Sequence, residues 1–301
     1  MRNIDLDSLE IFRTVAEAGG ILRASERLNR VPSNVTTRIK QLESRLGVPL
    51  FRKQGRGIVL SRDGELLLSY AQRLFRLADE VESELRNGTP TGVFRIGSLE
   101  STAGSRLPPV LSKYHRQFPG VVIELVTGTT CSLVQRVRSH EIEAAFVSEP
   151  FDAHELVSSP VFEEELVLIT AREVTEVRRA SCLRGMTLIA FADGCSYRKR
   201  VNEWLSASEV IPARTLEFAS YQAMIACVAA GTGFAVAPRT LLTALRATRD
   251  VAQHPLPVRI RRNRTHLIWA NPGSSALRHL RAILDASVGL GVPRQVVGKV
   301  T

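Results

Sequence analysis

Residues 28–51 of this chain combine a helical apolar stripe with short polar and cationic side chains. Pro32 suits the first position of a helix, because its φ angle is fixed and it has no N–H to satisfy. Apolar residues then recur at helical spacing, at Val35, Ile39, Leu42 and Leu46. Short hydrogen-bonding groups and cations lie largely off this apolar stripe and suit base edges and phosphates in a major groove. These candidate DNA-binding residues are Ser33, Asn34, Thr36, Thr37, Arg38 and Lys40.

A basic segment with glycines follows this helix. Two short apolar stretches in residues 49–60 flank a polar tip, a pattern typical of a β-hairpin. Arg52, Lys53 and Arg56 lie around the tip, where they could contact phosphates or a minor groove. Cationic loops also occur in ordinary helical bundles. A helix-turn-helix followed by a basic wing is more specific than either feature alone.

Three short helices must position these residues. An amphipathic pattern over 6–16 ends at Gly19-Gly20, a second helix is predicted over 21–28, and the third ends near Gly47. Short helices joined by tight turns describe a winged helix-turn-helix domain, mainly α, over residues 1–61.

A long helix is predicted over residues 62–88. Ser61 can cap it, and apolar residues recur in a heptad pattern that favours pairing of two chains. The seam residues are Leu67, Ala71, Leu74, Ala78, Val81 and Leu85. Packing of this helix on its own domain is the alternative. In a symmetric dimer, two recognition helices would meet successive major grooves roughly 34–36 Å apart.

The remaining two hundred residues alternate strands and helices. Strands are predicted at 93–98, 121–126 and 144–147, with helices between them, and a second such unit begins at 166–169. This alternation predicts an α/β domain with a mainly parallel sheet.

Ligands of such sheets bind beyond the carboxyl ends of strands, near helix N-termini. Polar residues at these positions are Ser98, Glu100, Ser101, Thr102, Thr129, Ser148, Ser196, Tyr197 and Tyr221. Each could equally be a cap or turn residue, and their recurrence at strand ends is the argument. Glu100 could pair with an amine on a ligand or with Arg198. The pattern favours a small polar metabolite with an amino group as the partner.

The charge distribution supports a polyanionic partner. The net charge is +10, and residues 1–62 hold 12 Lys/Arg and 6 Asp/Glu, a net charge of +6. Residues 239–301 hold 11 and 2, a net charge of +9, which we interpret as a solvated face in preference to a second nucleic-acid contact. Acidic residues stand where a signal peptide needs an apolar run, and no stretch approaches a membrane span. We therefore expect a cytoplasmic protein that does not bind membranes, with four reduced cysteines.

We expect no catalytic activity. The Gly231-x-Gly233 pair lacks the third glycine of a dinucleotide site, and the six histidines are scattered. No cofactor and no metal site is expected either.

The first 64 residues resemble the LysR-type transcriptional regulators. The match runs over residues 6–64 through Leu9, Phe12, Val15, Ala16, Gly19, Ala24, Leu28, Val35, Ile39, Leu42-Glu43, Leu46-Gly47, Leu50-Phe51, Leu60 and Gly64. This chain has Val31-Pro32 where the family usually has Ser-Gln, and it also differs at Thr36-Thr37-Arg38. The base preference of a typical member therefore does not transfer to this chain.

The rest resembles the LysR co-inducer domain, a two-lobed relative of the type 2 periplasmic binding proteins. Matching features include Phe118-Pro119-Gly120 and the segment 228–235. Turn-forming residues at 89–92 predict a linker. The resemblance implies an effector-binding domain at 93–292, and a basic tail follows at 293–301. Lobe one would comprise 93–166 and 268–292, and lobe two 167–267.

Together these features predict a sequence-specific regulator of transcription that binds double-stranded DNA and is controlled by a small-molecule effector between two lobes. It would be a homo-oligomer, a dimer through the linker helix or a tetramer. A solute-binding protein would explain only the C-terminal two-thirds of the chain, and an architectural DNA-binding protein would not need a ligand cleft.

Overall fold

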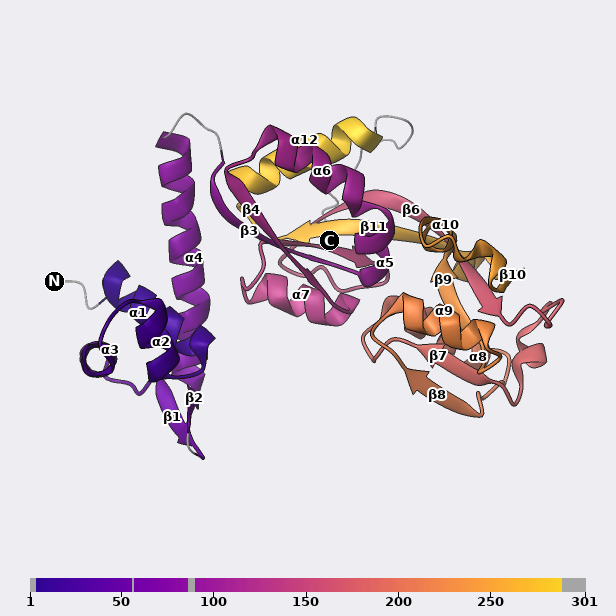
Figure 1. Cartoon of the computed structure of the whole chain (residues 1–301), viewed down its shortest axis with the longest axis horizontal. Helices are drawn as coiled ribbons and strands as arrows, with labels where there is room; N and C mark the ends of the chain where they lie inside the picture. The colour runs from indigo at the N-terminus through magenta and orange to yellow at the C-terminus, as the bar shows by residue number, and fades with distance from the viewer. Residues whose placement is uncertain (1–3, 56, 86–89, 289–301) are drawn as a thin grey trace, which may run out of the picture. The chain divides into compact units, whose positions relative to one another are not determined.

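The computed structural model describes residues 4–55, 57–85 and 90–288, which form two units (Figure 1). Arg56, residues 86–88 of the predicted linker helix, Thr89 of the linker and the basic tail at 293–301 lie outside the described residues.

The N-terminal unit begins with three helices. They are α1 (Leu6–Ala18), α2 (Ile21–Arg27) and α3 (Pro32–Leu46). Asp5 caps α1 by accepting the Ser8 N–H at 2.8 Å. Gly19 and Gly47 end α1 and α3 with φ angles of +66° and +74°, which a glycine adopts without strain. Phe12 and other fully buried apolar side chains fill the space between the helices, so the predicted helix-turn-helix is confirmed.

The wing is a two-stranded antiparallel hairpin. Strands β1 (Phe51–Gln54) and β2 (Gly57–Leu60) pair from Phe51 with Leu60 to Gln54 with Gly57. Glu43 fixes the hairpin to α3, because its Oε1 accepts the backbone N–H groups of Leu50 at 2.8 Å and Phe51 at 3.2 Å.

Helix α4 (Arg62–Leu85) follows the wing, and Ser61 Oγ caps it by accepting the Gly64 N–H at 3.0 Å. Gly64 allows a close approach, because a Cβ there would lie 2.1 Å from the Leu50 carbonyl oxygen. The predicted heptad seam is wrong in its first two members. Ala71 is fully buried and Leu67 packs against the core of its own domain. The exposed apolar stripe instead comprises Leu66, Tyr70, Leu74, Leu77 and Val81.

The C-terminal unit contains nine described strands and eight described α-helices. The strands are β3 (Gly92–Ser98), β4 (Val121–Thr127), β5 (Ala144–Ser148), β6 (Val157–Thr170), β7 (Thr187–Ala190), β8 (Arg214–Glu217), β9 (Ala235–Pro238), β10 (Ala252–Pro255) and β11 (Arg262–Trp269). The helices are α5 (Glu100–Ser105), α6 (Leu107–Gln117), α7 (Thr130–Arg138), α8 (Ser196–Ser206), α9 (Tyr221–Ala229), α10 (Arg239–Ala244), α11 (Val258–Arg261) and α12 (Ser275–Val288).

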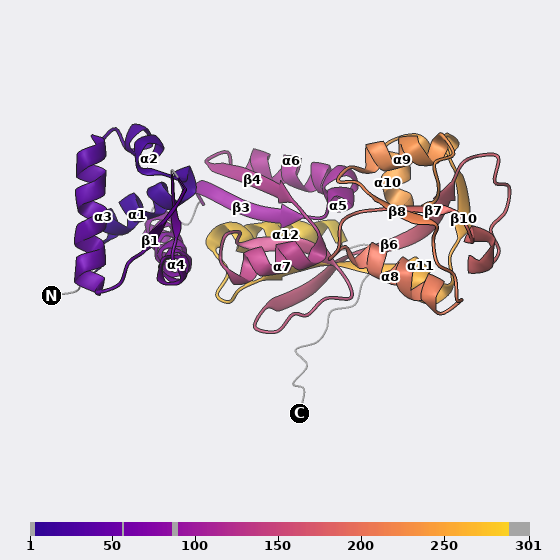
Figure 2. The same ribbon diagram turned by 90° about the horizontal axis from the view of Figure 1, so that it is seen from below.

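Strand β6 joins the two lobes. Its residues 157–165 pair with β11 in lobe one, and its residues 166–170 pair with β9 and β10 in lobe two (Figure 2). Strand β11 pairs with strands of lobe one along its whole length, from Arg262. The boundary expected at 267/268 therefore falls inside a strand of lobe one.

The sheet is mixed, and the prediction of a mainly parallel sheet is wrong. Its order is β10-β6-β11-β5-β3-β4, with β9 also paired to β6, while β7 and β8 form a separate pair. Only the β3–β4, β3–β5 and β7–β8 pairings are parallel among the strands of the described residues. Pairings of β6 and β11 are antiparallel, because β11 returns from lobe two between β5 and β6.

Helices cover both faces of the lobe-one sheet (Figures 1 and 2). Phe94, Phe146 and Leu280 are fully buried in the cluster that includes residues of α6 and α12. Leu133 of α7 is fully buried in a second cluster, which continues into lobe two through Phe234. The two lobes thus share part of one apolar core.

Candidate DNA-binding surface and effector pocket

The exposed face of α3 carries most of the predicted DNA-binding side chains. Exposed residues are Ser33, Asn34, Thr37, Arg38 and Lys40, while Val35, Ile39 and Leu42 face the core. Thr36 is half-buried, and its hydroxyl donates to the Pro32 carbonyl at 2.9 Å. This local bond makes Thr36 less available for a base than its neighbours.

Arg38 is held by an ion pair in the absence of DNA. Its Nη2 lies 3.5 Å from Asp7 Oδ2, and Asp7 also pairs with Arg30 at 2.9 Å. Exposed pairs of this kind contribute only about 0–1 kcal/mol. Arg38 can therefore leave Asp7 for a guanine or a phosphate at small cost.

The start of α3 is apolar. Val31 is the N-cap residue, is 64% exposed and makes no side-chain cap hydrogen bond, and Pro32 follows it without an N–H. The start of the helix therefore presents the two Val31 methyl groups and the Pro32 ring. Such methyl groups suit contact with a thymine methyl.

Two predicted wing residues are exposed on β1. Arg52 and Lys53 both lie on the exposed hairpin. Neither forms an ion pair with an acidic residue of the described parts of the chain. They can therefore supply positive charge to a phosphate backbone.

The predicted effector residues fall into two groups in the C-terminal unit. A pocket between the lobes is lined by Leu99, Glu100, Ser101, Gly128, Thr129, Phe191, Cys195, Ser196, Tyr197 and Tyr221. Six of the nine predicted residues are therefore brought together. Ser98, Thr102 and Ser148 are buried but do not line this pocket. Ser98 donates to the Leu99 carbonyl at 2.9 Å, and Ser148 hydrogen-bonds the Asn263 amide at 2.8 Å.

Glu100 reaches from lobe one to lobe two. Its Oε1 accepts the backbone N–H of Tyr221, the first residue of α9, at 3.3 Å. Its Oε2 is buried and has no hydrogen-bond partner among the described residues. Burial raises the pKa of Glu100, and the Tyr221 N–H opposes that shift. The Arg198 pairing considered from the sequence does not form, because Arg198 pairs with Glu217 at 2.6 Å and Asp193 at 3.3 Å.

The lobes also meet at the starts of α7 and α8. The Cys131 N–H donates to the Gly194 carbonyl at 3.2 Å, and the Thr130 hydroxyl donates to Ser196 Oγ at 3.4 Å. Burial raises the pKa of the Cys195 thiol. Thr130 was missed by the sequence reasoning, although it stands next to Thr129, a predicted residue at a strand end.

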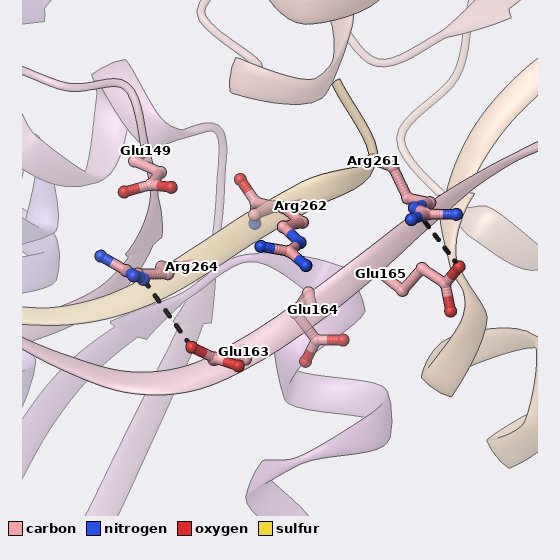
Figure 3. Close-up of a pocket in the computed structure, with 8 residues that line it drawn as sticks. Glu149, Glu163, Glu164, Glu165, Arg261, Arg262 and Arg264 are labelled. Carbon is pink, nitrogen blue, oxygen red and sulfur yellow. Dashed lines mark ion pairs between the residues drawn. The ribbon is translucent and has the colours of Figure 1, made fainter. Parts of the chain in front are cut away.

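A charged hollow of about 800 Å³ lies on the crossing strands, lined by Glu149, Glu163, Glu164, Glu165, Arg261, Arg262, Asn263 and Arg264. Figure 3 shows Arg264 facing Glu163 and Arg261 facing Glu165, at 3.9 and 3.8 Å. Residues 163–165 are acidic and residues 261–264 are mostly cationic. Their opposite charges are a sequence signal from which this pairing could have been predicted.

Glu164 differs from its neighbours because its side chain is only 3% exposed. It accepts hydrogen bonds from Arg106 Nε at 2.7 Å and from Thr240 Oγ1 at 2.6 Å. Arg106 belongs to lobe one and Thr240 to lobe two, so Glu164 ties both lobes to the strand that joins them.

Comparison with known proteins decides the family. Residues 6–65 match the family described as "Bacterial regulatory helix-turn-helix protein, lysR family", and residues 87–288 match "LysR substrate binding domain". The chain belongs to the LysR family. It is therefore a transcriptional regulator with a DNA-binding helix-turn-helix domain and an effector-binding domain of two α/β lobes.

Relatives of known sequence cover nearly the whole chain. The HTH-type transcriptional regulator YusT of Bacillus subtilis (strain 168) is 37% identical over 273 residues, 90% of this chain and 92% of that protein. GltR of the same organism is 34% identical over 254 residues, 84% of this chain and 86% of that protein.

Solved structures share the fold at lower identity. A full-length OxyR variant from Pseudomonas aeruginosa has a TM-score of 0.73 at 20% identity and covers 96% of both chains. Full-length CbnR in complex with its target DNA has a TM-score of 0.66 at 22% identity, covering 94% of this chain and 100% of that one. Among residues 4–55, 57–85 and 90–288, no helix has the length and apolar character needed to span a membrane.

Proposed function

We propose that this LysR-family regulator works in the cytoplasm as a homo-oligomer. It reads its operator through the exposed face of α3 and the wing, and a small polar molecule between the lobes changes its activity. The observation that carries the effector proposal is the pocket to which both lobes contribute polar side chains, with one buried carboxylate oxygen left unpartnered among the described residues. A ligand there would stabilise one arrangement of the lobes over another.

The α3 face supports base reading by Arg38 and phosphate binding by Lys53. Operator DNA would be obtained by selection from random sequence with the full-length protein. We expect Arg38→Ala to cost about 1–3 kcal/mol on the selected operator and much less on random DNA. Lys53→Ala should weaken both complexes similarly and lower the salt dependence by about one ion. An equal loss on operator and random DNA for Arg38→Ala would contradict base reading.

The exposed stripe on α4 supports pairing of two chains. Leu66, Tyr70, Leu74, Leu77 and Val81 recur on one side of this helix, and all are 43–58% exposed. We expect Leu77→Glu to shift the protein towards monomer in light scattering. Gln72→Glu is the matched control, because at about 100° per residue position 72 lies on the other side of the helix. Light scattering of the unaltered chain separates dimer from tetramer.

The effector pocket is tested by replacing a serine that lines it with the larger valine. Ser101 lines the pocket and is buried, whereas Ser132 on α7 is exposed. A small-metabolite panel would be screened by thermal shift with the full-length protein. We expect Ser101→Val to abolish the ligand-induced shift and Ser132→Val to preserve it, with DNA binding retained in both. A ligand-induced shift that survives Ser101→Val would exclude this pocket.

A further inference from the structure

The pocket between the lobes carries a single charged side chain. Among the described residues that line it, Glu100 is the only Asp or Glu, and no Lys, Arg or His is present. The other polar groups are hydroxyls, a thiol and backbone. A pocket with one carboxylate and no cation favours a positively charged ligand and repels an anion.

Glu100 is only half satisfied. Its Oε1 accepts the Tyr221 N–H at 3.3 Å, and its buried Oε2 accepts nothing from the described residues. An ionised carboxylate holds several acceptor sites, and a buried one without partners is costly. Arg198, the guanidinium considered from the sequence as a partner of Glu100, is already bound to Glu217 and Asp193. A donor on a ligand would satisfy Oε2 without breaking any of these contacts.

The other walls also suit a cation. The rings of Phe191 and Tyr221 lie with centroids 4.8 Å apart, and both residues line the pocket. Aromatic faces attract ammonium groups. The Tyr197 hydroxyl lies near those of Ser101 and Ser148 and makes no hydrogen bond of normal geometry to the described residues, so it remains a further acceptor.

The free space fits one small group. The pocket has a free volume of about 20 Å³, roughly enough for one water molecule. An –NH₃⁺ group is of similar size and brings three donors. A planar carboxylate needs more room and would meet the Glu100 carboxylate.

We propose that this pocket takes the protonated amino group of a small organic molecule, with Glu100 Oε2 as its principal acceptor and the Phe191 and Tyr221 rings beside it. The inference rests on the proposed effector pocket and adds the chemical class of the ligand. Because Glu100 belongs to lobe one and Tyr221 to lobe two, the bound amine contacts both lobes.

The test uses the full-length protein and probes that differ only in the charged group. Ethanolamine would be compared with ethylene glycol and glycolate, putrescine with 1,4-butanediol and succinate, and 2-phenylethylamine with 2-phenylethanol and phenylacetate. Binding would be measured by thermal shift and isothermal titration calorimetry near pH 7.5. We expect at least one amine to bind, and its alcohol and acid counterparts to bind about 10- to 100-fold more weakly.

Two variants assign the effect to Glu100. Glu100→Gln keeps an acceptor for the Tyr221 N–H but removes the charge, and we expect it to weaken amine binding about 10- to 100-fold. Glu163→Gln is the matched control, because Glu163 is 71% exposed and does not line the pocket. Thermal unfolding of each variant without ligand shows that it is folded.

Three results would overturn the inference: amine binding that is unchanged in Glu100→Gln, a panel in which no amine binds, or a panel in which only acids bind. If acids bind and Ser101→Val abolishes that binding, the effector pocket stands and only its ligand class is wrong. If the binding of every ligand is unchanged in both Ser101→Val and Glu100→Gln, the proposed effector pocket is wrong as well.

Discussion

Replacing Arg106 with methionine should destabilise the C-terminal unit, because it leaves Glu164 without its cation. The Glu164 side chain is 3% exposed, and Arg106 Nε lies 2.7 Å from its Oε1. Arg106 also donates to the Glu163 carbonyl at 2.9 Å. Methionine keeps an unbranched apolar chain of similar length, so the packing of the aliphatic portion is largely retained.

The expected loss follows from the two side chains' environments. Removing one partner of a fully buried ion pair costs about 3–5 kcal/mol. Arg106 is 32% exposed and Glu164 retains the Thr240 hydroxyl at 2.6 Å, so the free energy of unfolding should fall by less. We expect about 2–4 kcal/mol for Arg106→Met. For Glu164→Gln we expect about 1–2 kcal/mol, because the freed guanidinium still reaches water.

Urea unfolding of the full-length protein measures this loss. The two tryptophans, Trp204 and Trp269, both belong to the C-terminal unit, so their fluorescence reports on that unit. The double variant should lose about 1–3 kcal/mol less than the sum of the single variants. Additivity within about 0.5 kcal/mol would refute a direct Arg106–Glu164 interaction. Arg264→Met is the control, since its partner Glu163 is exposed and 3.9 Å away.

Three further predictions concern single positions. Asp5→Ala should lower the free energy of unfolding by about 1 kcal/mol, because it removes the cap of α1. In melts followed by circular dichroism, the difference in melting temperature between this variant and the unaltered protein should shrink as pH falls from 3.8 towards 2, because the capped carboxyl has a pKa of about 2. Burial raises the pKa of Glu100, so its ionisation in the folded protein lowers stability as pH rises. Glu100→Gln should therefore have a higher melting temperature than the unaltered protein near pH 7 and the same melting temperature near pH 4. A lower melting temperature near pH 7 would contradict this. Gly97→Ala should lower the free energy of unfolding in urea by about 1–3 kcal/mol, because its Cβ would lie 2.6 Å from both Ile142 Cδ1 and Leu133 Cδ2. Leu133→Ala opens a cavity and is destabilising by itself, so the double variant should lose less than the sum of the two single losses.

The N-terminal unit could be predicted closely from the sequence because its signals are local. The apolar stripe of α3, the glycines at 19 and 47 and the Ser61 cap each act within a few residues. The surface against which α4 packs could not be predicted from local sequence. Leu67 and Ala71 satisfy a heptad pattern equally well whether they face a second chain or their own domain, and only the fold places them on the domain's core.

In the C-terminal unit the sequence pattern failed where pairing is distant. Residues 157–165 of β6 end in three glutamates, which read as a loop when taken alone. They form a strand because Arg262, Asn263 and Arg264, a hundred residues later, pair with them and supply opposite charge at two of three positions. The strand-end rule found six of the residues that line the pocket, but it also selected Thr102, which is buried and does not line it. It selects loops, whereas the direction of each side chain depends on local packing.

Helix α5 links the pocket to the crossing strand, and this gives the two carboxylates related roles. Glu100 at its start accepts the Tyr221 N–H, and Arg106 at its end holds Glu164. Between them, Gly104 lies beside Leu241 of lobe two, since a Cβ there would be in ordinary van der Waals contact with Leu241 Cδ1 at 3.5 Å. We expect a short helix held at both ends to move as one piece. A ligand bound at Glu100 would then act on the same helix that holds Glu164, and through it on the junction of the lobes.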